Sequence, residues 1–156
     1  MPEPILVSRD GVIATVTLNN PERLNALNRP MWAGLGNTMR RLSAEDELRC
    51  IVVRGAGDRF AAGADIAEFE HERANARQAK EYGKVIHETM QAVARCRHPT
   101  VAMIKGPCVG GGLEIAAMCD LRIAGQSSRF GIPVNRLGLT MAYGELMGLL
   151  ALVGRA

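Results

Sequence analysis

Short runs of β-forming residues alternate with segments of helical periodicity along most of the chain, and this alternation restricts its fold more than any other feature. The dipeptide Asp10-Gly11 separates the first two runs, which predicts a β-hairpin. Alternating strands and helices predict an α/β domain in which part of the strand pairing is parallel. The expected strands are at residues 5–7, 12–18, 50–54, 100–105 and 121–124, and the expected helices are at residues 30–42, 82–94, 113–119 and 142–152.

Two stretches between these elements have no regular structure predicted. Residues 60–66 are mostly small, and residues 68–80 are charged and are predicted to be a mobile surface segment. No repeat or low-complexity linker divides the 156 residues, which predicts a single domain over residues 1–156. The final predicted helix is apolar and the chain ends just after it. We therefore expect that the chain is a fragment, or that another element or subunit covers this helix.

The composition excludes several classes of partner. The net charge of +3 is spread along the chain, and Lys and Arg form no dense block, so nucleic-acid binding is not predicted. His71, His87 and His98 lack the spacing of metal-ligand motifs, so no metal site is predicted. No apolar run is long enough to span a bilayer, so we expect no membrane partner.

The cysteines and the first residues bear on the cellular compartment. Cys50, Cys96, Cys108 and Cys119 have no CxxC spacing and lie in apolar segments, which predicts reduced, buried thiols. The first residues match neither a signal peptide nor a transit peptide. The sequence therefore predicts a cytoplasmic protein.

Three consecutive glycines, Gly110 to Gly112, precede the helix expected at residues 113–119. Glycine lets a backbone approach a ligand closely, and the free N–H groups and dipole of a helix N-terminus favour a negatively charged oxygen. Glu114 follows Gly111 by three residues and therefore lies on the same helical face. An oxyanion donor and a carboxylate directed at one point predict acid–base chemistry beside an activated carbonyl. Taken alone, the motif also fits a structural turn or a phosphate site.

Competing classes of enzyme lack their motifs in this chain. Neither the glycines at residues 55–57 nor those at residues 110–112 complete the GxGxxG pattern of a dinucleotide site. The chain has no GxxxxGK[ST] sequence of a P-loop and no GxSxG elbow of a serine hydrolase.

Three separated parts of the sequence together resemble the enoyl-CoA hydratase/isomerase family, also called the crotonase superfamily. The first two are residues 18–27 (LNNPERLNAL) and residues 60–66 (FAAGADI). The third is the turn at residues 110–114 (GGGLE), with residues 117–120 (AMCD) and 130–133 (FGIP) behind it. Their order and spacing agree with that family across nearly the whole chain.

The resemblance implies an α/β fold of the crotonase type, which is a spiral of β-β-α turns. This sequence resembles only the spiral core, without the later helical region that drives oligomer formation in the family. An acyl-CoA thioester is the implied substrate, with coenzyme A arriving as part of it and with no metal or redox cofactor. The implied assembly is a homo-oligomer, either a trimer or a dimer of trimers.

The same resemblance implies roles for particular residues. The backbone N–H groups of Ala64 and Gly111 would form an oxyanion hole for the thioester carbonyl, and Glu114 would hold or deprotonate water. Asp65 is also expected to cap the turn that follows it. The positions that match the family's coenzyme A contacts are Arg23, Leu24, Ala62, Asp65 and Ile66.

One position departs from the family's pattern. Val134 stands where typical hydratases carry a second glutamate. Glu145, near the start of the last helix, is another carboxylate, but the sequence does not show whether it reaches the site. Two carboxylates can divide the proton transfers of hydration between them, which one group performs less well. The resemblance implies hydration of a 2-enoyl-CoA, with a double-bond isomerase or a decarboxylase that uses Glu114 alone as alternatives. A further alternative is an acyl-CoA-binding protein without turnover.

Overall fold

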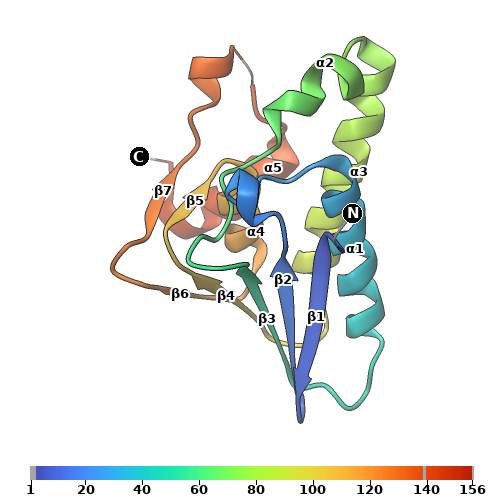
Figure 1. The fold of residues 1–156 in the computed structure, drawn as a ribbon, viewed down its shortest axis with the longest axis vertical. Helices are drawn as coiled ribbons and strands as arrows, with labels where there is room; N and C mark the ends of the chain where they lie inside the picture. The colour runs from blue at the N-terminus through green and yellow to red at the C-terminus, as the bar shows by residue number, and fades with distance from the viewer. Residues whose placement is uncertain (1–2, 139, 156) are drawn as a thin grey trace.

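The computed structural model describes residues 3–138 and 140–155. Its main sheet has five strands in the order β1-β2-β3-β4-β6 (Figure 1). β1 and β2 form an antiparallel hairpin, and all other neighbours in this sheet are parallel. The predicted hairpin and the partly parallel pairing are therefore confirmed. The strands are β1 (Ile5–Asp10), β2 (Ile13–Leu18), β3 (Cys50–Gly55), β4 (Thr100–Ile104) and β6 (Leu121–Ala124).

A second sheet of two strands was not predicted. It consists of β5 (Pro107–Val109) and β7 (Arg129–Gly131), which pair in parallel. Three residues are too few to show the alternation by which a strand is recognised in a sequence. Gly106 has a φ of +55°, and a Cβ there would lie 2.6 Å from the carbonyl oxygen of Asp58. A glycine is therefore needed where the chain passes from β4 into β5.

Two long helices, α1 (Arg29–Ser43) and α3 (Ala76–Ala94), pack against each other on one side of the molecule (Figure 1). Each begins after an asparagine, Asn28 or Asn75, whose side-chain oxygen accepts the backbone N–H three residues later, at 2.9 and 3.0 Å. These caps satisfy donors that a helix leaves unpaired in its first turn. Both helices were predicted, although α3 begins earlier than expected. Among the described residues, no helix has the length and apolar content needed to cross a membrane.

The hydrophobic core contains the buried faces of α1, α3 and the main sheet. The helices turn their apolar sides inward because their apolar residues recur with the helical period. Burial of one large apolar side chain contributes about 1.5–3 kcal/mol. All four cysteines have free thiols, and Cys108 and Cys119 are buried as predicted, whereas Cys50 and Cys96 are only half-buried. The largest fully buried side chains are Trp32, Tyr82, Phe60, Leu18, Leu27, Met31, Leu35, Met39, Leu42, Leu48, Ile51 and Met90.

The last two helices, α4 (Gly111–Met118) and α5 (Tyr143–Val153), pack against each other, and both were predicted. α5, all of whose residues are described, contains no buried residue. Tyr143 is 73% exposed and Val153 is 65% exposed. Within this chain, one side of an apolar helix is therefore uncovered.

The charged stretch at residues 68–80 is largely helical, which corrects the prediction of a mobile surface segment. It includes the end of the short helix η2 (Ile66–Glu68), all of α2 (Phe69–Glu72) and the first turns of α3. The carboxylate of Glu72 pairs with the guanidinium of Arg29 on α1 at 2.6 Å. This ion pair to another element helps to order the segment, although its composition alone is typical of a solvated loop.

Candidate active site

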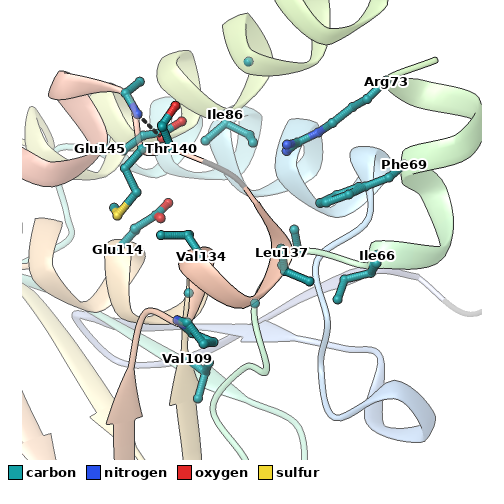
Figure 2. A pocket seen from close by; sticks show the side chains of 18 of the residues that line it. Ile66, Phe69, Arg73, Ile86, Val109, Glu114, Val134, Leu137, Thr140 and Glu145 are labelled. Atoms are coloured by element: carbon teal, nitrogen blue, oxygen red, sulfur yellow. Dashed lines mark hydrogen bonds between the residues drawn. The ribbon is translucent and has the colours of Figure 1, made fainter. Parts of the chain in front are cut away.

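A cavity of about 280 Å³ lies where the N-terminal end of α4 faces α2, α3 and the start of α5 (Figure 2). Most of its lining side chains are apolar. Its charged side chains, among the described residues, are Arg73, Glu114 and Glu145. No group of three or more His, Cys, Asp or Glu side chains within residues 3–138 and 140–155 could hold a metal ion.

The glycine turn brings the start of α4 to the wall of this cavity. Gly110 has a φ of +50°, and α4 begins at the next residue. A Cβ on Gly111 would lie 2.7 Å from Cζ2 of Trp32, and a Cβ on Gly112 would lie 2.6 Å from the carbonyl oxygen of Ala61. Real Cβ atoms essentially never approach other atoms so closely. The close approach of α4 therefore requires glycine at both positions, and the predicted place of the glycines at a helix N-terminus is confirmed.

The backbone N–H groups of Ala64 and Gly111, both on this wall, have no acceptor within the part of the chain that the structure describes. Leu27 pairs with the residues on either side of Ala64: it donates its N–H to the carbonyl of Gly63 at 2.7 Å and accepts that of Asp65 at 2.9 Å. Ala64 is skipped by this pairing, and Gly111 opens a helix, so neither N–H is bonded within residues 3–138 and 140–155. Both residues line the cavity, and a Cβ on Gly63 would lie 3.7 Å from the Gly111 nitrogen. Two such donors suit a negatively charged oxygen.

Glu114 lies in the first turn of α4 and is only 8% exposed. In Figure 2 its carboxylate points into the cavity. Burial raises its pKa from 4.5 to about 7, with a further increase from the charge of Glu145 and an opposing effect from Arg73. A carboxyl group with a pKa near 7 can both accept and donate a proton at neutral pH.

Glu145 brings a second carboxylate to the same cavity from α5. Its Oε2 accepts the backbone N–H of Ala142 at 3.0 Å, which fixes the side chain at the start of the helix. Val134, at the position where the resemblance implies a second glutamate, also lines the cavity and makes this part of its wall apolar (Figure 2). The sequence left the position of Glu145 open because it depends on how α5 packs against α4.

Arg73 is a cavity residue that the sequence analysis missed. Its guanidinium carbon lies 4.2 Å from the centre of the Phe69 ring and 4.4 Å from that of the Tyr82 ring. Its Nε is buried and has no hydrogen-bond partner among the described residues. The side chain extends into the cavity from the connection between α2 and α3 (Figure 2). The four-residue spacing of Phe69 and Arg73 is the signal that could have identified the stacked pair.

The five positions predicted to contact coenzyme A lie partly in this cavity and partly beside it. Ala62 and Ile66 line the cavity, whereas Arg23 and Asp65 line an adjacent hollow. The Asp65 carboxylate accepts the N–H two residues later at 3.1 Å and pairs with Arg23 at 2.8 Å. The expectation that Asp65 caps the following turn is confirmed. Leu24 lies next to them, and its carbonyl accepts the N–H of Ala62 at 3.1 Å.

Comparison with known sequences gives a consistent set of relatives. A family model described as enoyl-CoA hydratase/isomerase matches residues 8–156. A short-chain-enoyl-CoA hydratase from Clostridium acetobutylicum is 33% identical over 151 residues, which cover 96% of this chain and 57% of that protein. A crotonyl-CoA hydratase from Syntrophomonas wolfei is 31% identical over 153 residues, which cover 97% of this chain and 58% of that protein.

Solved structures give the same result. An enoyl-CoA hydratase/carnithine racemase from Magnetospirillum magneticum matches with a TM-score of 0.96 at 47% identity, over 99% of this chain and 58% of that one. An enoyl-CoA hydratase from Bacillus anthracis matches with a TM-score of 0.91 at 29% identity, over 98% of this chain and 59% of that one. The predicted fold class is confirmed, and this chain spans somewhat more than half the length of each of these relatives.

Proposed function

Because this chain belongs to the enoyl-CoA hydratase/isomerase family, we propose that it adds water to the double bond of a 2-enoyl-CoA thioester. One arrangement carries the proposal: the unbonded N–H groups of Ala64 and Gly111 lie on the same cavity as the buried carboxylate of Glu114. A thioester carbonyl bound by the two amides would place its acyl chain beside that carboxylate. Relatives named as hydratases support the same reaction.

The two amides act on the carbonyl oxygen of the thioester. Hydrogen bonds from Ala64 and Gly111 stabilise the negative charge that this oxygen gains when the β-carbon is attacked and an enolate forms. Such donors are effective because they are fixed in place before the reaction, and loss of one typically costs about 10²–10³ in rate. The main contribution of the glycine turn to catalysis is therefore the position of one N–H group.

Glu114 carries the proton. In its carboxylate form it takes a proton from water while the water oxygen bonds to the β-carbon. The π electrons of the double bond move towards the thioester and form the enolate. Glu114 then returns the proton to the α-carbon, so that one water molecule is added and the carboxylate is regenerated. A pKa of about 7 suits both transfers, because neither protonation state is strongly favoured at neutral pH.

Glu145 supports Glu114 in this proposal. Its charge raises the pKa of Glu114, which makes the Glu114 carboxylate a stronger base towards the attacking water. Only Oε2 of Glu145 is used by the Ala142 N–H, so the other oxygen can orient the attacking water. Glu145 would thereby supply, from another element, the second carboxylate that is missing at Val134.

We propose that the positions matched to the family's coenzyme A contacts bind the coenzyme A part of the thioester. Arg23 is already paired with Asp65, so we expect contacts with the carrier to be made mainly by the backbone of these two segments. The residues proposed to line the coenzyme A moiety are Arg23, Leu24, Ala62, Asp65 and Ile66.

A double-bond isomerase is the second candidate, and Val134 is the observation that favours it. Isomerisation needs one base that removes a proton from one carbon and returns it to another, which Glu114 could do alone. An apolar wall beside that base would also disfavour a bound water. Decarboxylation with Glu114 stays a prediction from the sequence.

Mass spectrometry in deuterium oxide tests the proposal. Crotonyl-CoA and 3-butenoyl-CoA are incubated with the wild type, with Glu114→Gln, and with Glu88→Gln as a control on the exposed side of α3. We expect crotonyl-CoA to gain a whole heavy water with the wild type and the control, but not with Glu114→Gln. A shifted double bond with only carbon-bound deuterium would make the protein an isomerase. Thioester binding without either product would contradict catalysis and leave a binding protein.

A further inference from the structure

We propose that this cavity selects acyl-CoA thioesters whose acyl group ends in a second carboxylate, and that Arg73 binds that carboxylate. The inference rests on the proposed function, because it assumes that the acyl group of a thioester occupies the cavity. It adds the chemical class of the substrate, which neither the glycine turn nor Glu114 determines.

Arg73 differs from other arginines around it in having no ion pair among the described residues. Nearby, Arg29 pairs with Glu72 on α2, and Arg77 pairs with Glu81 on α3. The Nε of Arg73 is buried without a hydrogen-bond partner, although its side chain borders open cavity space. Because Nε is fully buried, a ligand carboxylate would pair with the terminal N–H groups of the guanidinium, on the side chain that lines the cavity.

The guanidinium is also held in a fixed orientation. It lies against the Phe69 ring at 4.2 Å and against the Tyr82 ring at 4.4 Å, which are cation–π distances. Stacking against the two rings restricts the rotation of the planar group. An arginine fixed in this way can bind a carboxylate with two parallel hydrogen bonds, which a lysine cannot do.

The position of Arg73 suits the far end of an acyl group. Figure 2 shows Arg73 and Glu114 on different sides of the cavity, with apolar side chains, including Ile86 and Val134, between them. If the thioester carbonyl lies at the start of α4, the acyl chain must cross this apolar region to reach the guanidinium. A cavity of about 280 Å³ is small for a ligand pocket, so the acyl chain must be short.

Binding of two saturated thioesters tests the inference without relying on turnover. Isothermal titration calorimetry compares glutaryl-CoA, which ends in a carboxylate, with pentanoyl-CoA, which has the same number of acyl carbons. The proteins are the wild type, Arg73→Gln, Arg73→Lys and the control Arg77→Gln, whose side chain is 77% exposed on α3. Charge-assisted hydrogen bonds predict a preference of about tenfold or more for glutaryl-CoA in the wild type and in the control.

Substitution of Arg73 should abolish that preference. Arg73→Gln should bind the two thioesters equally well, and Arg73→Lys should retain a smaller preference because it keeps the charge and loses the planar fork. Binding of pentanoyl-CoA reports in each variant that the cavity is still folded. An unchanged preference in Arg73→Gln would overturn the inference. If Arg73→Gln weakened the binding of both thioesters and of free coenzyme A equally, the inference would also be overturned, because Arg73 would then bind the phosphates of coenzyme A.

Turnover of glutaconyl-CoA and 2-pentenoyl-CoA separates this inference from the proposed function. Hydration of both at equal kcat/KM, with no effect of Arg73→Gln on the ratio, would contradict the inference and leave the function intact. Hydration of neither, together with Arg73-dependent binding of glutaryl-CoA, would contradict the function and leave the anion site intact. The expected result is faster hydration of glutaconyl-CoA, by about tenfold or more, in the wild type only.

Discussion

At the scale of single residues, Glu114 shows how the fold determines the chemistry of a side chain. A glutamate on the surface is ionised at neutral pH, but this carboxyl lies in an apolar cavity at the start of a helix. Burial makes the largest contribution to its raised pKa, and the neighbouring Glu145 adds to it. Both effects favour the protonated form, which has consequences for stability as well as for catalysis.

Glu114→Gln should stabilise the protein at alkaline pH. The folded-state pKa of about 7 exceeds the ordinary value of 4.5, so the folded protein binds more protons than the unfolded chain between these values. The wild type therefore loses stability as the pH rises through this window, by about 3 kcal/mol in total. Glutamine does not titrate, so the stability of the Glu114→Gln variant should not fall over this pH range for this reason.

The measurement is the free energy of unfolding in urea at several pH values for both proteins. Near pH 4 the two should be similar, and near pH 8 the variant should be more stable by up to about 3 kcal/mol. A stability difference that does not change with pH would show that Glu114 is not buried as a neutral acid.

The neighbours of Glu114 should move its titration in opposite directions. Glu145 raises the pKa of Glu114 and Arg73 lowers it. Glu145→Gln should therefore shift the acid limb of the kcat/KM profile for crotonyl-CoA to lower pH, and Arg73→Gln should shift it to higher pH. Identical midpoints in the wild type and both variants would contradict this arrangement of charges.

At the scale of elements, the segment at residues 60–66 positions one of the two amides without being a helix or a long strand. Single bridges connect Ala64 with Leu27 and Ala61 with Cys108. The side chain of Asp65 then caps η2 and pairs with Arg23. A few directional hydrogen bonds therefore hold the Ala64 N–H at the cavity.

Removal of the Asp65 cap should cost more than removal of its ion pair. Asp65→Ala loses both the hydrogen bond to the following turn and the pair with Arg23, so we expect a loss of about 1 kcal/mol in stability. Arg23→Ala loses only the pair, which is 56% exposed on the arginine side, so its cost should be less than half as large. Urea unfolding of both variants tests this order, and equal losses would contradict it.

Elements with a clear period could be predicted from the sequence, and shorter ones could not. The hairpin and α1 follow from alternation and helical spacing over many residues, and Glu114 could be related to Gly111 because one helical turn joins them. β5 and β7 are too short to show a period. The many charged residues of α2 are typical of a solvated loop, so the helix that precedes Arg73 was not predicted. The approach of Glu145 depends on tertiary packing, which no local pattern encodes.

At the scale of the whole molecule, one edge of the main sheet exposes apolar side chains. β6 is the last strand of that sheet, and its residues Leu121 and Ile123 are 59% and 64% exposed on the same face. Phe130, on β7, is 53% exposed. Exposed apolar surface of this kind is typical of interfaces. We predict that this face mediates self-association of the chain, although the chain lacks the later helical region that drives oligomer formation in the family.

A charge on β6 should therefore disrupt self-association. We expect the wild type to sediment as an oligomer and Ile123→Lys to sediment as a monomer. Val12→Lys, at the hairpin turn, changes a side chain of similar exposure (50%) and should leave the assembly unchanged. Sedimentation of the wild type as a monomer would contradict the prediction.

The central claim is that a thioester carbonyl is polarised between the N–H groups of Ala64 and Gly111. Difference infrared spectroscopy of bound crotonyl-CoA, with ¹³C at the thioester carbonyl, measures this polarisation directly. The carbonyl stretch should fall below its frequency in water with the wild type and with the control Gly125→Ala, which lies outside the cavity and where the nearest atom to a Cβ would be 3.7 Å away. It should fall much less with Gly111→Ala, where the Cβ would displace Trp32. A stretch that does not move on binding to the wild type would contradict the oxyanion hole.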